Sequence, residues 1–174
     1  AEALDLLKKK KNLRLYQIPQ GGNLAQAQIK SVRGGLLIQD ANQALAEDWR
    51  QVTHLAPSED QKADLEFGLK IVKHVKSNAI VVAKNGQTLG IGAGQMNRVG
   101  AAKLALEQAG DKAKGAVLAS DAFFPMPDSL EIAADYGISA VVQPGGSIKD
   151  QASIDVANEK GVAMVFSTTR HFKH

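Results

Sequence analysis

Short apolar runs separated by polar segments of helical spacing make up the C-terminal two thirds of the chain. The clearest example is an apolar run rich in Val and Ile at 78–84, followed by Asn85-Gly86 and a second run at 87–94. Asn-Gly favours the tight turn that joins two antiparallel strands, since both residues tolerate positive φ. The pattern therefore predicts a β-hairpin, followed by a helix that begins at Asn97.

Further apolar runs follow at 116–119, 138–143 and 162–166, and each is separated from the next by a segment with helical spacing. From residue 78 onward the predicted order is β-β-α-β-α-β-α-β. Strands that alternate with helices are typical of an α/β fold with a largely parallel sheet. We therefore predict the α/β class, with the hairpin as the antiparallel element.

Upstream of the hairpin the pattern predicts two helices and two strands. We expect helices over 1–11 and 58–76, and strands over 12–18 and within 25–39. The second helix begins at a capping-box sequence, a Ser followed three residues later by Gln. A Gly-Gly pair inside the second strand indicates a bulge or a close backbone approach.

The composition narrows the class of protein. A chain of 174 residues with 44% hydrophobic residues suits a single domain, 1–174, and the lack of cysteine excludes disulfides and thiolate metal sites. The net charge is +3 and the lysines are spread out, so we expect no nucleic-acid partner. No apolar run approaches the ~18 residues of a membrane span, so we expect no membrane partner and a cytoplasmic setting.

Ligands of α/β sheets bind where strands end at their carboxyl edge. Arg98 falls in the first turn of the predicted helix, where free N–H groups and the helix dipole already favour an anion. Phe123 and Phe124 are adjacent and cannot both point into one core, so one of them can stack on a flat ligand or pack within its loop. Three loops are candidates for the site: 94–98, 120–128 and 143–147.

The glycine-rich run at 90–94, GIGAG, invites comparison with a dinucleotide-binding loop. The fingerprint G-x-G-x-x-G needs a glycine at position 95, where this chain has Gln95. The predicted order around it is also a hairpin and not a βαβ unit, so the pattern does not favour a nicotinamide cofactor.

Histidines offer no clear catalytic or metal-binding pattern. Lys73 and His74 are adjacent on a predicted helix, and adjacent residues point about 100° apart, so they cannot readily act on one atom. His171 and His174 are three residues apart near the C-terminus with no carboxylate beside them in sequence. Spacing alone therefore predicts an α/β domain with a cluster of ligand loops and no particular reaction.

Long stretches of the chain nevertheless carry a family pattern. They are SNAIVVAKNGQTLGIGAGQMNRV at 77–99, ASDAFFPMPDSLEIAADYGISAVVQPGGSIKD at 119–150 and GVAMVFSTTRHFKH at 161–174. With RGGLLIQD at 33–40, they resemble the AICAR transformylase domain of the bifunctional purine biosynthesis protein that also carries IMP cyclohydrolase. That domain resembles two tandem cytidine-deaminase-like units without zinc, and this chain resembles the second, C-terminal unit. The resemblance implies a three-layer α/β unit with a mixed, mostly parallel sheet.

The resemblance also implies a reaction and a set of substrate-binding residues. The family transfers a formyl group from 10-formyltetrahydrofolate to the 5-amino group of AICAR, giving FAICAR. Asn78 would lie against the carboxamide and the reacting amine and is the one catalytic residue carried over. Arg98 would meet AICAR, at its phosphate, Phe123 would line or stack on the imidazole, and Arg170 would hold the nucleotide.

A folate side and a cation site follow from the same resemblance. Asp128, which spacing alone predicts to be a helix N-cap, would bind the pterin. An alkali cation, potassium, would lie near Ser77 and Asp121. Four further residues would shape the folate side: Asn97, Val99, Pro125 and Met126.

One part of the family pattern is missing from these 174 residues. The family's Lys-His pair, which moves the proton and stabilises the oxyanion, belongs to the first unit, and no segment of this chain resembles it. We therefore expect a shortened product that is inactive alone, and we expect it to form a homodimer. The alternative is a non-catalytic fragment that binds a nucleotide or only dimerises.

Overall fold

The computed structural model describes residues 2–16, 27–45 and 48–173. The chain folds as two compact units, Ala1–Ala41 and Asn42–His174, and each is described by itself. The prediction of one domain over 1–174 stays a prediction.

The first unit contains a helix and a hairpin. The helix α1 spans Glu2–Lys8 and has no buried residue. Strands β1 (Ala27–Val32) and β2 (Gly35–Asp40) pair antiparallel, with Val32 opposite Gly35. The chain reverses at Gly34, whose φ is +86°, so the predicted single strand with a bulge is wrong. The predicted strand 12–18 is also wrong over 12–16, and residues 17–18 lie outside the described residues.

The second unit is built on a six-stranded sheet with the order β3-β8-β7-β6-β4-β5. Its strands are β3 (Arg50–Gln51), β4 (Ile80–Lys84), β5 (Gln87–Gly92), β6 (Val117–Ser120), β7 (Ala140–Gln143) and β8 (Ala163–Phe166). Its helices are α2 (Glu59–Val72), α3 (Arg98–Ala109), the 3₁₀ turn η1 (Gly110–Ala113), α4 (Asp128–Asp135) and α5 (Asp150–Lys160).

The sheet is mixed, as predicted, but it is not mostly parallel. Strand β7 runs parallel to both β6 and β8. The pairings β4–β5, β4–β6 and β3–β8 are antiparallel. The expectation failed because β4 pairs antiparallel with β6 as well as with β5, and because β3 adds an antiparallel strand beside β8.

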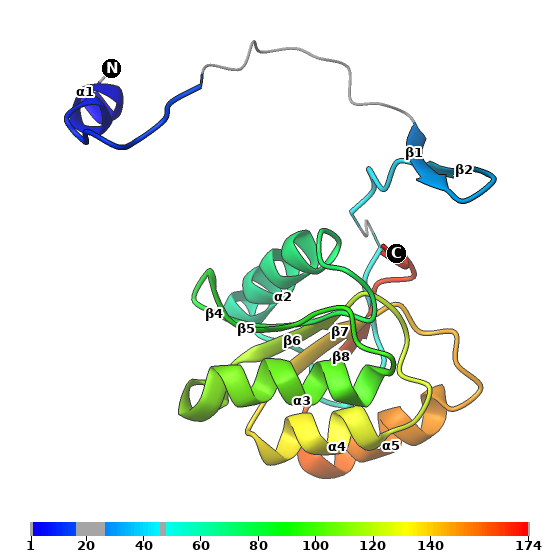
Figure 1. The fold of residues 1–174 in the computed structure, drawn as a ribbon. Coiled ribbons are helices and arrows are strands. Elements are labelled where there is room, and N and C mark those ends of the chain that lie inside the picture. The colour runs from blue at the N-terminus through cyan, green and yellow to red at the C-terminus, as the bar shows by residue number, and fades with distance from the viewer. Residues whose placement is uncertain (1, 17–26, 46–47, 174) are drawn as a thin grey trace. The chain divides into compact units, whose positions relative to one another are not determined.

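Helices cover both faces of this sheet, with α2 on one face and α3, α4 and α5 on the other (Figure 1). Strand β4 shows why, since successive side chains of a strand point to opposite faces. Ile80 and Val82 pack in the cluster with α3 and α4, whereas Val81 and Ala83 pack in the cluster with α2. All four are fully buried, which explains the continuous apolar run in the sequence.

The glycine-rich run of β5 has a packing role. A Cβ atom at Gly90 or Gly92 would lie 1.9 Å from a backbone oxygen of α3, at Ala105 and Ala101 respectively. The helix therefore approaches the strand so closely that only glycine fits at these two positions. This contact accounts for the first two glycines of GIGAG without a dinucleotide, and the third, Gly94, has a positive φ of +64°.

None of the helices in the part of the chain that the structure describes combines the length and the apolar character needed to cross a bilayer.

Candidate functional site

The predicted ligand loops lie along one edge of the sheet, the edge at which strands β6, β7 and β8 end. Strands β6, β7 and β8 are parallel, so their carboxyl ends meet at this edge, and antiparallel β4 brings its amino end there, with Ile80 opposite Ser120. The loops that follow β5, β6 and β7 therefore lie beside the segment that enters β4 and the segment that follows β8. This placement agrees with the predicted loop cluster.

Asp121 is the centre of a buried polar network at this edge, which we call the Asp121 network: Ser77, Asn78, Arg98, Asp121 and His171. The Asp121 side chain is fully buried. Its Oδ2 accepts a hydrogen bond of 2.5 Å from Ser77 Oγ, and its Oδ1 accepts from Arg98 Nη1. Its backbone oxygen accepts from the His171 N–H at 2.8 Å. Asp121 thus joins three segments that are far apart in sequence.

Arg98 stands at the start of α3, as predicted, but its charge is already paired. The cap of the helix is Asn97, whose side chain accepts from the Gly100 N–H at 2.7 Å. Arg98 is only 5% exposed, and it donates to Ala79 O at 3.1 Å and to Asn78 Oδ1 at 2.9 Å besides its ion pair with Asp121. A guanidinium that is neutralised by a buried carboxylate is poorly suited to a phosphate. The geometry instead favours a role in orienting Asn78.

Asn78 is held at both ends of its side-chain amide. Its Oδ1 accepts from Arg98, and its Nδ2 donates to Gln95 O at 2.9 Å. The Ser77–Asn78 peptide bond is cis. One further N–H and one further lone pair remain on the half-buried amide for a ligand. The predicted contact with a carboxamide and an amine is therefore chemically feasible.

Phe123 and Arg170 meet at the same edge. The Arg170 guanidinium carbon lies 5.9 Å from the centre of the Phe123 ring, within cation–π range. Arg170 is exposed and Phe123 is half-buried, whereas Phe124 is fully buried. The two phenylalanines thus point into different surroundings, as predicted, and the ring of Phe123 stays available together with a cation.

His171 is a residue whose surroundings the sequence did not reveal. Its side chain is fully buried, its Nδ1 lies 3.0 Å from Asn42 Oδ1, and its Nε2 has no hydrogen-bond partner within the described residues. Burial lowers its pKa below 6.5, the nearby Lys73 lowers it further, and Asp121 opposes both. Spacing could not find this group, because Asn42, Lys73 and Asp121 are all distant in sequence. His174 lies outside the described residues.

The residues predicted for the folate side come from two helix starts. Asp128 is the first residue of α4, and its Oδ1 accepts from the Ser129 N–H at 2.7 Å. The N-cap is Pro127, with no side-chain cap hydrogen bond, so the prediction that Asp128 caps this helix is wrong. Pro125 and Met126 are exposed in the preceding loop, while Asn97 is exposed and Val99 half-buried at the start of α3. Their contact with a pterin stays a prediction.

The predicted alkali-cation site does not fit well. Asp121 Oδ1 and Oδ2 are bonded to Arg98 and Ser77, and the guanidinium already balances the carboxylate. A second cation would meet a positive neighbour and no free carboxylate. Among the described residues, no group of three or more His, Asp or Glu side chains could hold a metal ion either.

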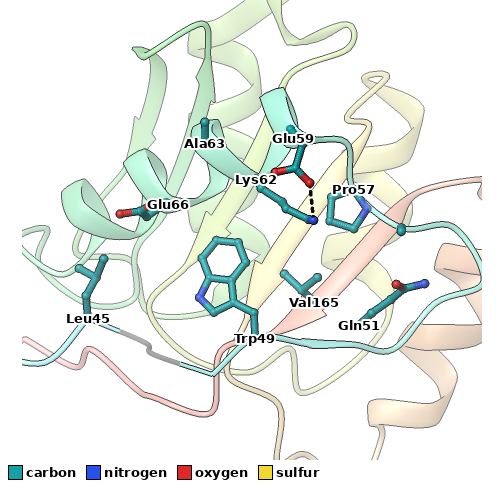
Figure 2. A pocket seen from close by; sticks show the side chains of 10 residues that line it. Leu45, Trp49, Gln51, Pro57, Glu59, Lys62, Ala63, Glu66 and Val165 are labelled. Atoms are coloured by element: carbon teal, nitrogen blue, oxygen red, sulfur yellow. Dashed lines mark hydrogen bonds and ion pairs between the residues drawn. The ribbon is translucent and has the colours of Figure 1, made fainter.

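A separate cavity of about 680 Å³, which we call the α2 pocket, lies between α2 and the strand β8. Figure 2 shows Trp49 at its centre, with Glu59 and Lys62 of α2 paired at 2.7 Å above it. None of the residues predicted for AICAR or folate lines it. Its lining consists of Leu45, Trp49, Gln51, Ala56, Pro57, Glu59, Lys62, Ala63, Glu66 and Val165.

Sequence comparisons identify the family. The sequence model described as AICARFT/IMPCHase bienzyme matches residues 1–108. The chain belongs to the AICARFT/IMPCHase bienzyme family. It is 57% identical over 176 residues to the bifunctional purine biosynthesis protein PurH of Anoxybacillus flavithermus, covering 99% of this chain and 34% of that protein. It is 58% identical to PurH of Lysinibacillus sphaericus, covering 99% and 35%.

The chain spans about a third of the length of the curated bienzyme relatives that it matches. Among solved structures, RibD of Acinetobacter baumannii is 20% identical to this chain, with a TM-score of 0.40. The alignment covers 60% of this chain and 33% of the RibD chain. This score is too low to support a conclusion about the fold. The cytidine-deaminase-like and three-layer descriptions therefore stay predictions.

Proposed function

We propose that this chain is part of an AICAR transformylase, which makes FAICAR in purine biosynthesis by transferring the formyl group of 10-formyltetrahydrofolate to the 5-amino group of AICAR. It would supply the second, C-terminal unit of the transformylase domain. The observation that carries this proposal is the convergence of Asn78, Phe123 and Arg170, from three distant segments, around Asp121. A purine precursor with a flat ring, a carboxamide and a phosphate matches these three groups.

Each group would have a distinct task. The half-buried amide of Asn78 would orient the carboxamide and the reacting amine, because its remaining N–H and lone pair are unused. Phe123 would contact the imidazole, and exposed Arg170 would pair with the phosphate. Arg98 would act through Asn78, since its charge is matched by Asp121.

The chemistry requires more than these residues. The amine of AICAR is a poor nucleophile, so it needs orientation against the formyl carbon and removal of a proton as the bond forms. The tetrahedral oxyanion also needs a donor. The Lys-His pair implied by the family resemblance has no counterpart in these 174 residues, so we expect this chain to bind AICAR without appreciable turnover.

The folate would lie between the starts of α3 and α4. Met126 is 50% exposed and Pro125 is exposed, so both offer apolar surface to a pterin. Asp128 would accept from the pterin amino group with its second carboxylate oxygen. An alkali cation has no part in this proposal, because the Arg98 guanidinium already balances the charge of the Asp121 carboxylate.

Isothermal titration of the purified chain with AICAR tests the proposal. We expect binding that Arg170→Ala weakens at least about tenfold, the size of a lost charge-assisted contact. Arg50→Ala is the matched control, because the Arg50 guanidinium lies 5.5 Å from the Phe166 ring in a similar cation–π pair that includes none of the residues proposed to contact AICAR. A wild-type chain that gives no heat would refute the proposal.

A steady-state assay with AICAR and 10-formyltetrahydrofolate tests the missing acid–base pair. Turnover by the purified chain at the rate of a complete PurH would contradict the expectation that this chain is inactive alone. The alternative function, a fragment that only dimerises, is favoured by the exposed apolar residues on the β1–β2 hairpin, among them Ile29 and Ile38 at 67% and 69% exposure. Light scattering that finds a dimer, together with no AICAR binding, would support that alternative.

A further inference from the structure

The backbone around Phe123 is held by two buried side chains. Ser120 Oγ donates a hydrogen bond of 2.7 Å to Ala122 O, and the Phe124 N–H donates one of 3.0 Å to Gln143 Oε1. Ser120 and Gln143 are both fully buried. The two hydrogen bonds hold the peptide groups on either side of Phe123.

Holding both peptide groups fixes the direction in which the Cα–Cβ bond of Phe123 leaves the backbone. A peptide group is planar, so the backbone at each residue has only the two soft dihedrals φ and ψ. The Ala122–Phe123 peptide plane sets φ of Phe123, and the Phe123–Phe124 plane sets its ψ. The fully buried ring of Phe124 anchors the loop on the core side.

The buried amide of Gln143 has little use apart from this loop. Within the described residues its Nε2 donates only to Met164 Sδ, at 3.6 Å, and a thioether is a weak acceptor. Burying an amide with one poorly satisfied end costs stability. A methionine of similar length would fill the same space without that cost, so the gain from glutamine lies at Oε1 and the Phe124 N–H.

We propose that Gln143 is a positioning residue that sets the Phe123 ring against Arg170. It does not touch the ligand, but acts through the loop that carries Phe123. The consequence for binding rests on the proposed function, since the ring would be the surface on which the AICAR imidazole lies. The effect on the ring itself does not depend on any ligand.

Two variants at one position separate the hydrogen bond from the packing. Gln143→Met removes the acceptor, whereas Gln143→Glu, as a neutral buried carboxyl group, keeps one acceptor oxygen. We expect Gln143→Met to lose the nuclear Overhauser effect between the Phe123 ring and the Arg170 side chain, and to weaken AICAR binding about tenfold. Gln143→Glu should keep the Overhauser effect and bind within about threefold of wild type.

Asp64→Ala is the control for a general loss of stability. Asp64 is 9% exposed, and its carboxylate oxygens accept from the Asn85 and Gly86 N–H groups at 2.8 Å, at the end of β4 opposite to the Phe123 loop. This variant should lower the melting temperature and leave both the Overhauser effect and AICAR affinity unchanged. An unchanged Overhauser effect in Gln143→Met, or an equal loss in Asp64→Ala, would overturn the proposal. If wild type does not bind AICAR, the proposed function fails, while the Overhauser comparison still decides the role of Gln143.

Discussion

The Asp121 network and the α2 pocket both contain ion pairs, but of opposite kinds. The Arg98–Asp121 pair joins residues 23 positions apart, with side chains 4% and 0% exposed. In the α2 pocket, Lys62 and Glu59 are three positions apart on one helix, with side chains 48% and 88% exposed. The first pair holds distant segments together, whereas the second lies on the exposed surface of a single helix.

Burial changes how much stability is lost when one partner of an ion pair is removed. An exposed pair is screened by water and contributes little to stability. A buried pair adds little net stability over apolar packing, but the loss of one partner leaves an uncompensated charge. We therefore expect the edge with the Asp121 network to be intolerant of substitution and the α2 pocket to be tolerant.

Asp121→Ala should have the largest effect on stability. It leaves the Arg98 guanidinium buried without its counter-charge, so we expect the free energy of unfolding to fall by about 3–5 kcal/mol. Urea denaturation measures this. The matched control is Asp135→Ala, which removes an exposed carboxylate paired with Lys160 at 3.3 Å and should cost under about 1 kcal/mol. Equal losses in the two variants would show that burial does not determine the cost of breaking an ion pair in this protein.

Ser77→Ala should have an intermediate effect. The Ser77 hydroxyl donates to Asp121 and accepts from the Lys173 N–H at 2.9 Å, so its removal leaves two groups short of a partner. We expect a loss of about 1–3 kcal/mol by the same measurement. Ser147→Ala, which removes a hydroxyl bonded to the exposed Lys149 N–H, should change stability far less. A loss in Ser77→Ala no larger than that of the control would show that the network is loosely held.

The buried His171 predicts a pH dependence of stability. Its pKa is lowered below 6.5 in the folded chain, chiefly by burial, so the unfolded chain binds a proton more readily. The contribution of the neutral ring is fully present above about pH 6.5 and is lost as the pH falls through the folded pKa. Urea denaturation from about pH 8 to about pH 5 should show this slope, and His171→Gln should reduce it. Exposed His54→Gln should retain the wild-type slope; the reverse result would contradict the assignment.

Glu59→Gln should have the smallest effect. It breaks the exposed pair with Lys62 while leaving Trp49 and the rest of the α2 pocket in place. We expect the free energy of unfolding to change by under about 0.5 kcal/mol, and AICAR binding to stay at the wild-type value. A large change in binding would move the candidate site to the α2 pocket.

Local patterns predicted much of the second unit. The Asn85-Gly86 turn, the helix start at Asn97 and the capping box at Ser58 all depend on residues within a few positions of one another, and all three are present. The apolar runs likewise gave β4, β6, β7 and β8. Neighbours along the chain determine these features, so the sequence contains the information directly.

Long-range pairing could not be predicted in the same way. The alternation of apolar residues identified β4 but not its antiparallel pairing with β6, which makes the sheet less parallel than expected. Spacing placed Arg98 at a helix start, but gave no indication that Asp121 would neutralise it or that buried His171 would donate its N–H to the Asp121 backbone oxygen. These contacts depend on which strands become neighbours, and the periodicity of one strand does not specify its partners.

The central claim is that separate segments form one binding surface for an anionic purine precursor. A double-mutant cycle in AICAR binding, with Phe123→Ala, Arg170→Ala and the double variant, tests it most directly. Because the guanidinium lies 5.9 Å from the ring centre, we predict that the two losses are not additive, with a coupling of about 1 kcal/mol. Strictly additive losses, or single variants that bind AICAR as tightly as wild type, would contradict the claim.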